Sequence, residues 1–256
     1  MTEHILSSAF RPASRFHRST DLVRDFSDAS ALNGYFLTDF GKQCLARITQ
    51  GLTEGSSARA WRLTGDYGSG KSSFALLLAA TLADSRSLPK RLQPEVLATS
   101  PQLRRARYIP LLVVGAREPM SVAIVRGLLD THRKYLGRSS KSGLEERLDK
   151  LSRAGSGIPD QVVTDLVEEV TTNLVKHGKG SGLILVLDEV GKFLEYAGLH
   201  PDKQDVFLLQ KLGELASRSG DTPFLFVCLL HQGFNAYADN LATPAKREWE
   251  KVAGRL

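Results

Sequence analysis

This 256-residue sequence has few cysteines, no long apolar run and no apolar leader. Its apolar runs, such as residues 183–187 and 224–230, are far shorter than the roughly 20 residues that a membrane-spanning helix needs. The first thirty residues contain acidic side chains and no continuous apolar stretch, so a secretory signal is not expected. The two cysteines, Cys44 and Cys228, are read as thiols in a reducing compartment. We therefore expect a cytoplasmic protein without a membrane segment.

The sequence is basic, with a formal net charge of +6. A basic balance suits nucleic acid, anionic lipid or polyphosphate partners, although it specifies none of them. The charge is concentrated in two clusters, and each also fits an ordinary solvated surface. The clusters are Arg11, Arg15, His17 and Arg18, and then Lys90, Arg91, Arg104, Arg105 and Arg107.

Short apolar segments alternate with helical patterns along the chain. Continuous β-branched runs are typical of strands that are buried on both faces. Strands that alternate with helices indicate a parallel sheet with flanking helices, which is an α/β fold. The predicted strands are residues 60–63, 108–114, 183–187 and 224–230. The predicted helices are residues 41–52, 72–82, 121–135, 143–153, 160–176 and 202–217.

The sequence divides into a lead-in and a core. Residues 1–33 are polar and basic, and residues 34–256 contain the alternating pattern. Residues 138–182 are predicted to be a helical insertion in this core. The chain ends after a helical pattern at 245–252, whereas an α/β domain of this kind usually has a further strand and a cap. We therefore expect the N-terminal part of a larger protein, with the C-terminal lid absent.

A phosphate-binding loop is the strongest signal in the sequence. Residues 65–72, GDYGSGKS, match G-x-x-x-x-G-K-[ST] at every fixed position. The glycines permit positive φ, so backbone N–H groups can surround phosphate oxygens at the N-terminus of the next helix. Lys71 is expected to reach the β- and γ-phosphates, and the Ser72 hydroxyl to ligate Mg²⁺. The expected nucleotide-binding residues are Gly65, Asp66, Tyr67, Gly68, Ser69, Gly70, Lys71, Ser72 and Ser73.

An acidic pair follows the third predicted strand. Asp188 and Glu189 come directly after the apolar residues 183–187. Ligands of open α/β sheets bind outside the carboxyl ends of the strands, where the phosphate-binding loop is also expected. Asp188 is therefore expected to hold Mg²⁺, and Glu189 to orient and activate the attacking water. An apolar strand before two acidic residues is by itself a weak signal for a magnesium site. The position of this strand after the phosphate-binding loop in the sequence strengthens the signal.

Further candidates lie near the expected γ-phosphate. His231 and Gln232 follow the fourth predicted strand and can act as a sensor of the phosphate or the water, although simple strand termination also explains them. Arg255 is a candidate catalytic arginine that reaches a nucleotide, often in a neighbouring subunit. Arg117 is a rival for this role, and a surface location fits both arginines. Residues 35–38 (YFLT) either pack near the adenine edge or belong to the core.

The loop, the acidic pair, the sensor strand and Gly254-Arg255, in this order, resemble AAA+ ATPases, closest to the origin-recognition-like and STAND-like branches. The resemblance spans residues 33–256, although Leu256 stands where that family usually has Phe. The phrases GDYGSGKSSFALLLA, LDEVGKFLEYA and LLHQGFNAYA are similar to bacterial phage-defence ATPases of the BREX type. The resemblance implies ATP and Mg²⁺ as cofactors, and an ATPase coupled to DNA or partner proteins in a homo-oligomer or defence complex. No fifth strand, helical lid or sensor-2 arginine is visible, which leaves cooperative hydrolysis by this chain in doubt.

The sequence thus predicts a P-loop NTPase of the AAA+ type, whose Mg²⁺-dependent ATP hydrolysis drives or gates assembly on a macromolecular partner. Nucleic acid is the leading partner, and no membrane is expected. The alternative is an ATP-gated switch or scaffold with little turnover. A small-molecule kinase also uses a phosphate-binding loop, but it has no need of Glu189 after Asp188.

Overall fold

A four-stranded parallel sheet forms the centre of the protein in the computed structural model, which describes residues 20–137, 143–200 and 206–232. The strand order is β1-β4-β3-β2, and all neighbouring pairs are parallel. The four predicted strands are confirmed, and their boundaries differ from the predicted ones by at most one residue. The strands are β1 (Ala60–Thr64), β2 (Tyr108–Val114), β3 (Gly182–Asp188) and β4 (Phe224–Leu230).

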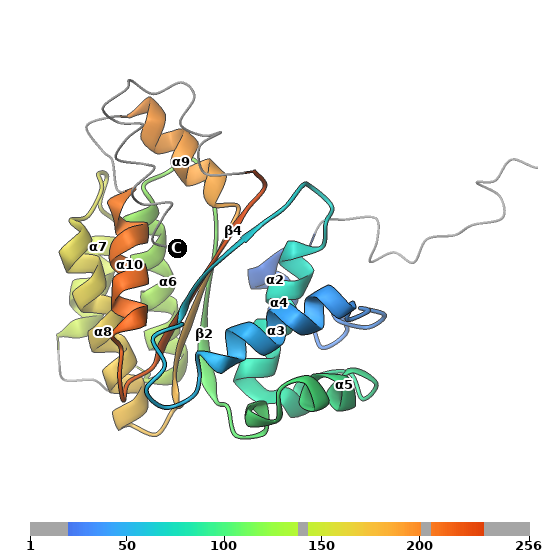
Figure 1. Ribbon diagram of the computed structural model, residues 1–256. Helices are drawn as coiled ribbons and strands as arrows, with labels where there is room; N and C mark the ends of the chain where they lie inside the picture. Colours follow the sequence, from blue (N-terminus) through green and yellow to red (C-terminus); the bar gives the residue numbers. More distant parts are fainter. Residues whose placement is uncertain (1–19, 138–142, 201–205, 233–256) are drawn as a thin grey trace, which may run out of the picture.

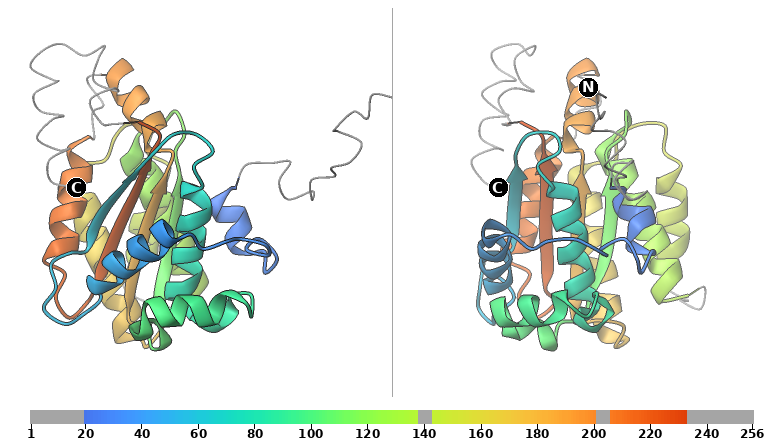
Figure 2. Two further views of the ribbon diagram at one scale, coloured as in Figure 1. Left: turned by 45° about the vertical axis from the view of Figure 1, so that its right-hand side comes forward. Right: turned by 90° about the vertical axis from the view of Figure 1, so that its right-hand side faces the viewer.

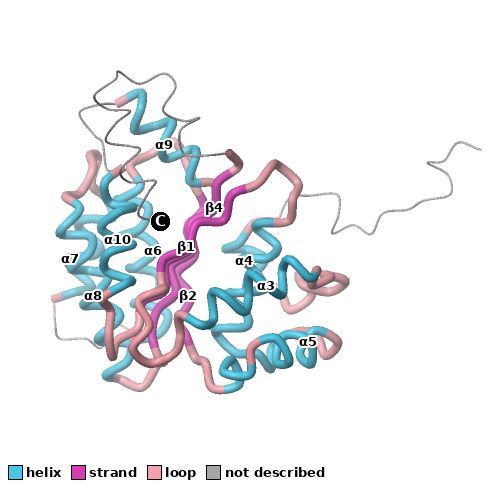
Figure 3. Tube along the Cα trace, in the orientation of Figure 1, coloured by secondary structure: helices cyan, strands magenta, loops and turns pink. Residues whose placement is uncertain are grey.

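Helices cover both faces of the sheet, which gives the three-layer α/β arrangement seen in Figure 1 and Figure 3. This arrangement is compatible with the predicted P-loop fold. On one face lie α2 (Leu22–Phe26), α3 (Asp39–Gln50), α4 (Lys71–Asp84) and α5 (Leu92–Thr99), with the short 3₁₀ turns η2 (Ser85–Ser87) and η3 (Pro101–Arg104). On the other face lie α6 (Met120–Tyr135), α7 (Leu144–Ser152), α8 (Asp160–Lys176) and α10 (Phe207–Ser217). Helix α9 (Val190–Leu199) follows β3 and stands at the carboxyl edge of the sheet, at the top of Figure 1.

The alternation of side chains along β3 explains why two separate cores form. Leu183, Leu185 and Leu187 pack with α6, α8 and α10, whereas Ile184 and Val186 pack with α3, α4 and α5. Successive strand residues point to opposite faces, so a strand covered on both faces must be apolar throughout. Every residue of β3 is accordingly buried. Truncating one of these leucines to alanine is expected to cost about 2–5 kcal/mol.

The segment predicted as an insertion forms part of the helical layer. Helices α7 and α8 both pack against α6, and α8 also packs against α10 and β3. Val163, Val167 and Leu174 of α8 are fully buried in the same core as Leu185. Residues 160–182 therefore provide the connection to β3 and cover one face of the sheet. Residues 138–142 lie outside the described part of the chain.

The described part of the lead-in is partly helical, and two helices further along the chain differ from the sequence-based expectation. Within the predicted lead-in, residues 20–33 contain the short helix α2, whose Leu22 is fully buried against the α4 side of the sheet. The first basic cluster lies outside the described residues. Helices α5 and α9 were not predicted. No helix in the described part is long and apolar enough to cross a membrane.

Candidate functional site

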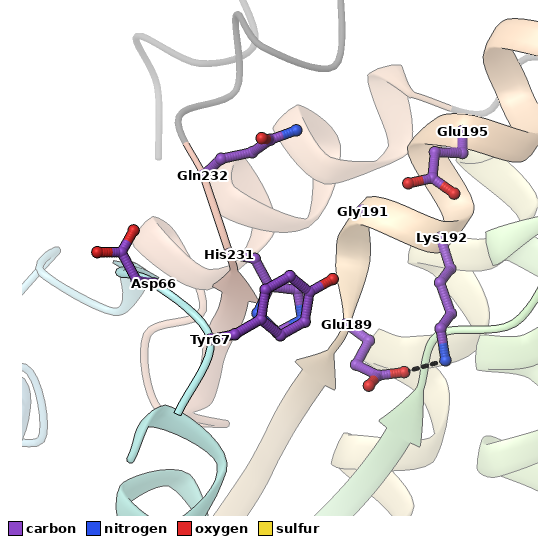
Figure 4. A pocket seen from close by; sticks show the side chains of 8 residues that line it. All are labelled: Asp66, Tyr67, Glu189, Gly191, Lys192, Glu195, His231 and Gln232. Atoms are coloured by element: carbon purple, nitrogen blue, oxygen red, sulfur yellow. Dashed lines mark ion pairs between the residues drawn. The ribbon is translucent and has the colours of Figure 1, made fainter. Parts of the chain in front are cut away.

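The carboxyl ends of β1, β3 and β4 deliver the predicted site residues to one edge of the sheet. In open α/β sheets this is the edge where ligands bind. A pocket of about 440 Å³ opens there, within the size range of small-molecule sites. Figure 2 shows from two directions that α9 stands beside this edge and that α4 runs away from it along one face of the sheet. The pocket is lined by Asp66, Tyr67, Glu189, Gly191, Lys192, Glu195, His231 and Gln232, which Figure 4 shows as sticks.

The loop of residues 65–70 has the backbone geometry that its glycines predict. Gly68 and Gly70 have φ of 77° and 86°, a region that costs other residues roughly 1–2 kcal/mol. Gly70 is the N-cap of α4 and makes no side-chain capping bond, so no side chain blocks the first amides of that helix. The Lys71 ammonium donates to the carbonyl oxygens of Gly65 at 2.5 Å and of Asp66 at 2.8 Å. A fixed cation and a helix N-terminus thus lie together, which favours an anion.

Asp188 and Ser72 meet although they come from different elements. Asp188 ends β3 and is only 2% exposed. Burial raises the pKa of its carboxyl group, and hydrogen bonds from the Ser72 hydroxyl and the Glu189 backbone N–H oppose this rise. The Glu189 N–H donates to Asp188 Oδ1 at 2.7 Å. Helix α4 follows β1 in the chain, and β4 lies between β1 and β3 in the sheet. The helix packs across the sheet against β3 and β2, and this brings Ser72 in its first turn to the end of β3.

The oxygen donors of this pair fit a magnesium ion. Mg²⁺ is usually held by one or two carboxylates together with waters and substrate phosphates. One hydroxyl and one buried carboxylate beside an anion-binding loop provide such a donor set. In the described part of the chain, no group of three or more His, Cys, Asp and Glu side chains gathers as a metal site. The assignment of Ser72 and Asp188 as metal ligands stays a prediction.

Glu189 has an unusual backbone conformation. Its φ of 50° is the only positive value at a non-glycine residue in the described part of the chain. Such conformations cost about 1–3 kcal/mol and gather at functional sites. The neighbouring Gly115 is required here, because an added Cβ would lie 2.1 Å from the Glu189 carbonyl oxygen. The Glu189 carboxylate forms an ion pair with Lys192, three residues later at the start of α9 (Figure 4).

His231 and Tyr67 stack at the mouth of the pocket. Their ring centroids are 3.7 Å apart, and the planes differ by 17°. Tyr67 is 80% exposed, whereas His231 Nδ1 is buried without a hydrogen-bond partner among the described residues. Burial, and then the positive charge of Lys71, lower the pKa of His231. The imidazole is therefore neutral at neutral pH, with one ring nitrogen that a ligand can satisfy. Gln232 lines the pocket next to it.

The remaining predicted residues lie elsewhere. The Ser73 hydroxyl is hydrogen-bonded to Thr20 at 2.9 Å, so it contacts the N-terminal segment rather than the pocket. Arg117 is exposed in the segment after β2 and does not line the pocket. Arg255 lies outside the described residues. In the YFLT segment, Leu37 is fully buried and Tyr35 packs against the same core, which agrees with the core-packing alternative for these two residues. Thr38 caps α3, and Phe36 is 71% exposed.

Three pocket residues on α9 were missed by sequence reasoning. They are Gly191, Lys192 and Glu195. A signal for the helix was present, because the buried residues Val190, Phe193, Leu194 and Ala197 follow the spacing of one helix face. A helix that begins directly after Glu189 places a residue three positions later next to it. The Lys192 contact was therefore predictable once α9 was recognised.

Comparison of the chain with family models, with curated proteins and with solved structures finds no match. Any function assigned to this protein therefore depends on its sequence motifs and on the geometry of this edge. Two features stand out: a glycine-rich loop that holds the Lys71 ammonium at the N-terminus of α4, and an acidic pair whose Asp188 lies close to Ser72.

Proposed function

We propose that this protein binds Mg-ATP at the carboxyl edge of its sheet and hydrolyses it. The proximity of Ser72 to Asp188, close enough for the hydroxyl to lower the pKa of that carboxyl group, is the observation that supports this best. It brings a hydroxyl from the loop helix and a buried carboxylate from β3 together, beside Lys71. An accidental glycine-rich turn has no reason to be matched by a carboxylate 116 residues further along the chain, a separation given by 188 − 72.

Each residue then has a separate role in holding the triphosphate. The loop amides and the Lys71 ammonium bind phosphate oxygens, after Lys71 exchanges its carbonyl partners for the ligand. Ser72 and Asp188 hold Mg²⁺, which neutralises charge on the phosphates when it is bound. Burial in a site of low dielectric strengthens the interaction of Asp188 with any cation.

Glu189 is the residue that acts on the attacking water. Its carboxylate lines the pocket, and it can accept a proton from a water placed in line with the terminal phosphate. His231 and Gln232 line the same pocket from the adjacent strand β4, where a side-chain donor can contact the terminal phosphate. A positioned base of this kind contributes about 10²–10⁴-fold to a rate.

The resemblance to AAA+ ATPases extends this proposal to ATP as the nucleotide and to a macromolecular partner. In such an enzyme an arginine from a neighbouring subunit stabilises the transition state, and Arg255 and Arg117 are the candidates. A homo-oligomer, a DNA partner and a role in anti-phage defence belong to the same extension.

The ion pair between Glu189 and Lys192 favours a second candidate, an ATP-gated switch with little turnover. An ammonium group that pairs with the carboxylate competes with the attacking water for its oxygens. However, the Lys192 side chain is 49% exposed, and exposed ion pairs are worth about 1 kcal/mol or less. The pair can therefore lower the rate only a few-fold. We rank the switch below the hydrolase for this reason.

The test is phosphate release from Mg-ATP, measured per chain over a range of protein concentrations. A hydrolase that shares arginines between subunits gains specific activity as concentration rises. Replacing Lys192 by Met should raise turnover by about two- to fivefold, the range set by an exposed ion pair. ATP binding without turnover in both proteins would favour the switch. A failure to bind ATP at all would contradict both functions.

A further inference from the structure

The opposite edge of the sheet, where the strands begin, brings together two basic segments that are distant in sequence. Residues 101–107 (PQLRRAR) precede β2, and residues 176–182 (KHGKGSG) lead into β3. The Ser181 N–H donates to the Arg107 carbonyl oxygen at 2.8 Å, and Tyr108 is in register with Gly182. Neighbouring strands lie about 4.8 Å apart, so the two segments meet where they enter the sheet.

Neither segment contains an acidic residue. Four of their cations are exposed and form no ion pair among the described residues; we call these four the basic edge. Arg107 differs from them, because it is half-buried and lies 3.9 Å from Asp84. Asp84 pairs with Arg107, and a group of like charges such as the other four creates a local positive potential. The basic edge consists of Arg104, Arg105, Lys176 and Lys179.

We propose that the basic edge binds the phosphate backbone of duplex DNA. This inference rests on the proposed function, since it names the macromolecular partner of the ATPase. Several unpaired Lys and Arg side chains are what counterion release from a polyanion requires. The two segments contain no aromatic side chain, so backbone contact fits better than stacking on unpaired bases.

An anionic membrane is the other polyanionic surface that four cations can meet. Stable membrane attachment needs apolar side chains or a lipid anchor in addition to charge. The exposed large hydrophobic side chains of the described residues all lie outside residues 101–107 and 176–182. The basic edge therefore lacks the apolar component, and this favours nucleic acid.

The basic edge is separated from the nucleotide site by the length of the sheet. Strand β3 begins at Gly182, beside the basic edge, and ends at Asp188. Six steps of roughly 3.3 Å place these two ends about 20 Å apart. DNA and nucleotide can therefore be bound at the same time. DNA binding by this edge should not require ATP.

The experiment measures the anisotropy of a fluorescent 30-base-pair duplex with the full chain, from 50 to 200 mM KCl and without nucleotide. We expect binding that weakens steeply with salt. The double variants Arg104→Gln/Arg105→Gln and Lys176→Gln/Lys179→Gln should each weaken binding about tenfold or more, and should reduce the salt slope by about 1.8. The matched control Lys42→Gln/Lys150→Gln removes two charges from α3 and α7, and its affinity and slope should stay near those of the wild type.

Three results would overturn the inference: no salt-dependent binding of the duplex by the wild type, equal losses in the control and the basic-edge variants, or binding to phosphatidylserine vesicles but not to DNA. Thermal unfolding of each variant shows whether it is folded. Lys71→Ala separates this inference from the proposed function, because it should retain DNA binding. Normal DNA binding by a wild type that neither binds nor hydrolyses ATP would contradict the proposed function and leave the basic edge supported.

Discussion

The two edges of the central sheet differ in how their charges are paired. At the carboxyl edge, cations and anions contact one another or polar groups: Lys71 donates to loop carbonyls, Asp188 accepts from the Glu189 N–H, and Lys192 pairs with Glu189. At the amino edge, Arg104 and Lys179 belong to a group without ionic partners in the described part of the chain. The same strands connect both edges, so the contrast comes from the residues placed at the strand ends.

The difference in pairing corresponds to a difference in the ligand that each edge suits. A pocket with both signs of charge suits a ligand that carries a metal cation and phosphates together. An exposed surface of one sign suits an extended polyanion, to which it can bind without a defined pocket. Substitutions should therefore have large, position-specific effects at the carboxyl edge and smaller, additive effects at the amino edge.

The largest expected effect comes from Glu189→Gln. The amide keeps the size of the side chain but cannot accept the proton, so turnover should fall by about 10²–10⁴-fold while ATP affinity is retained. Steady-state phosphate release and equilibrium ATP binding measure the two quantities. Glu195→Gln is the matched control, because Glu195 lines the same pocket but lies more than one helical turn beyond Glu189. The turnover of this variant should be nearly unchanged. Equal loss in both variants would remove Glu189 from its special role.

A smaller effect is expected for Asp188→Asn, in both function and stability. The loss of the carboxylate should reduce the affinity for Mg²⁺ at least about tenfold. Burial holds the pKa of Asp188 above its unfolded value, so the charged carboxylate costs free energy at every pH above the folded pKa. Removing the charge should therefore raise Tm at pH 7, by about 2–4 °C if the gain is near 1 kcal/mol.

Calorimetry at pH 7 measures the Tm change of Asp188→Asn. The basic-edge variants sharpen the contrast, because their exposed side chains should leave Tm nearly unaltered. A lower Tm for Asp188→Asn would show that its hydrogen bonds outweigh the cost of burying the charge.

The smallest expected effect is on the pH dependence of Tm, and it comes from a buried histidine away from both edges. His132 of α6 is fully buried, and both of its ring nitrogens lack a partner among the described residues. Burial lowers the pKa of His132 below the unfolded value of about 6.5. The contribution of neutral His132 to the free energy of unfolding is therefore complete above about pH 6.5. It is lost as the pH falls through the pKa of the folded state. Tm should therefore fall between pH 7.5 and pH 5.

The variant His132→Leu should show a weaker fall, by about 2–4 °C for each kcal/mol that His132 contributes. Part of the acid sensitivity should remain, because the pKa of His231 is lowered in the same direction. An identical pH dependence in the variant and the wild type would show that His132 is protonated without cost in the folded protein.

The contrast between the edges also explains what was predictable from the sequence. The carboxyl edge is encoded by contiguous motifs, so residues 65–72 and the acidic pair could be recognised directly. The basic edge depends on strand order, because Arg104 and Lys179 are brought together only by the pairing of β2 with β3. Lys192 was missed because α9 was not recognised, although its apolar spacing is regular. The conformation of Glu189 depends on tertiary contacts with Gly115, which no local pattern reveals.

Calorimetric titration with ATP and Mg²⁺ tests the proposal that the carboxyl edge binds a nucleoside triphosphate through Lys71. The wild-type chain should bind ATP, and Lys71→Ala should lose about 100-fold or more in affinity, as expected when a charge-assisted contact worth nearly 3 kcal/mol is removed. Lys192→Ala, which removes the same charge from the same edge of the sheet, should bind ATP nearly as well as the wild type. Unchanged ATP affinity in Lys71→Ala would contradict the account.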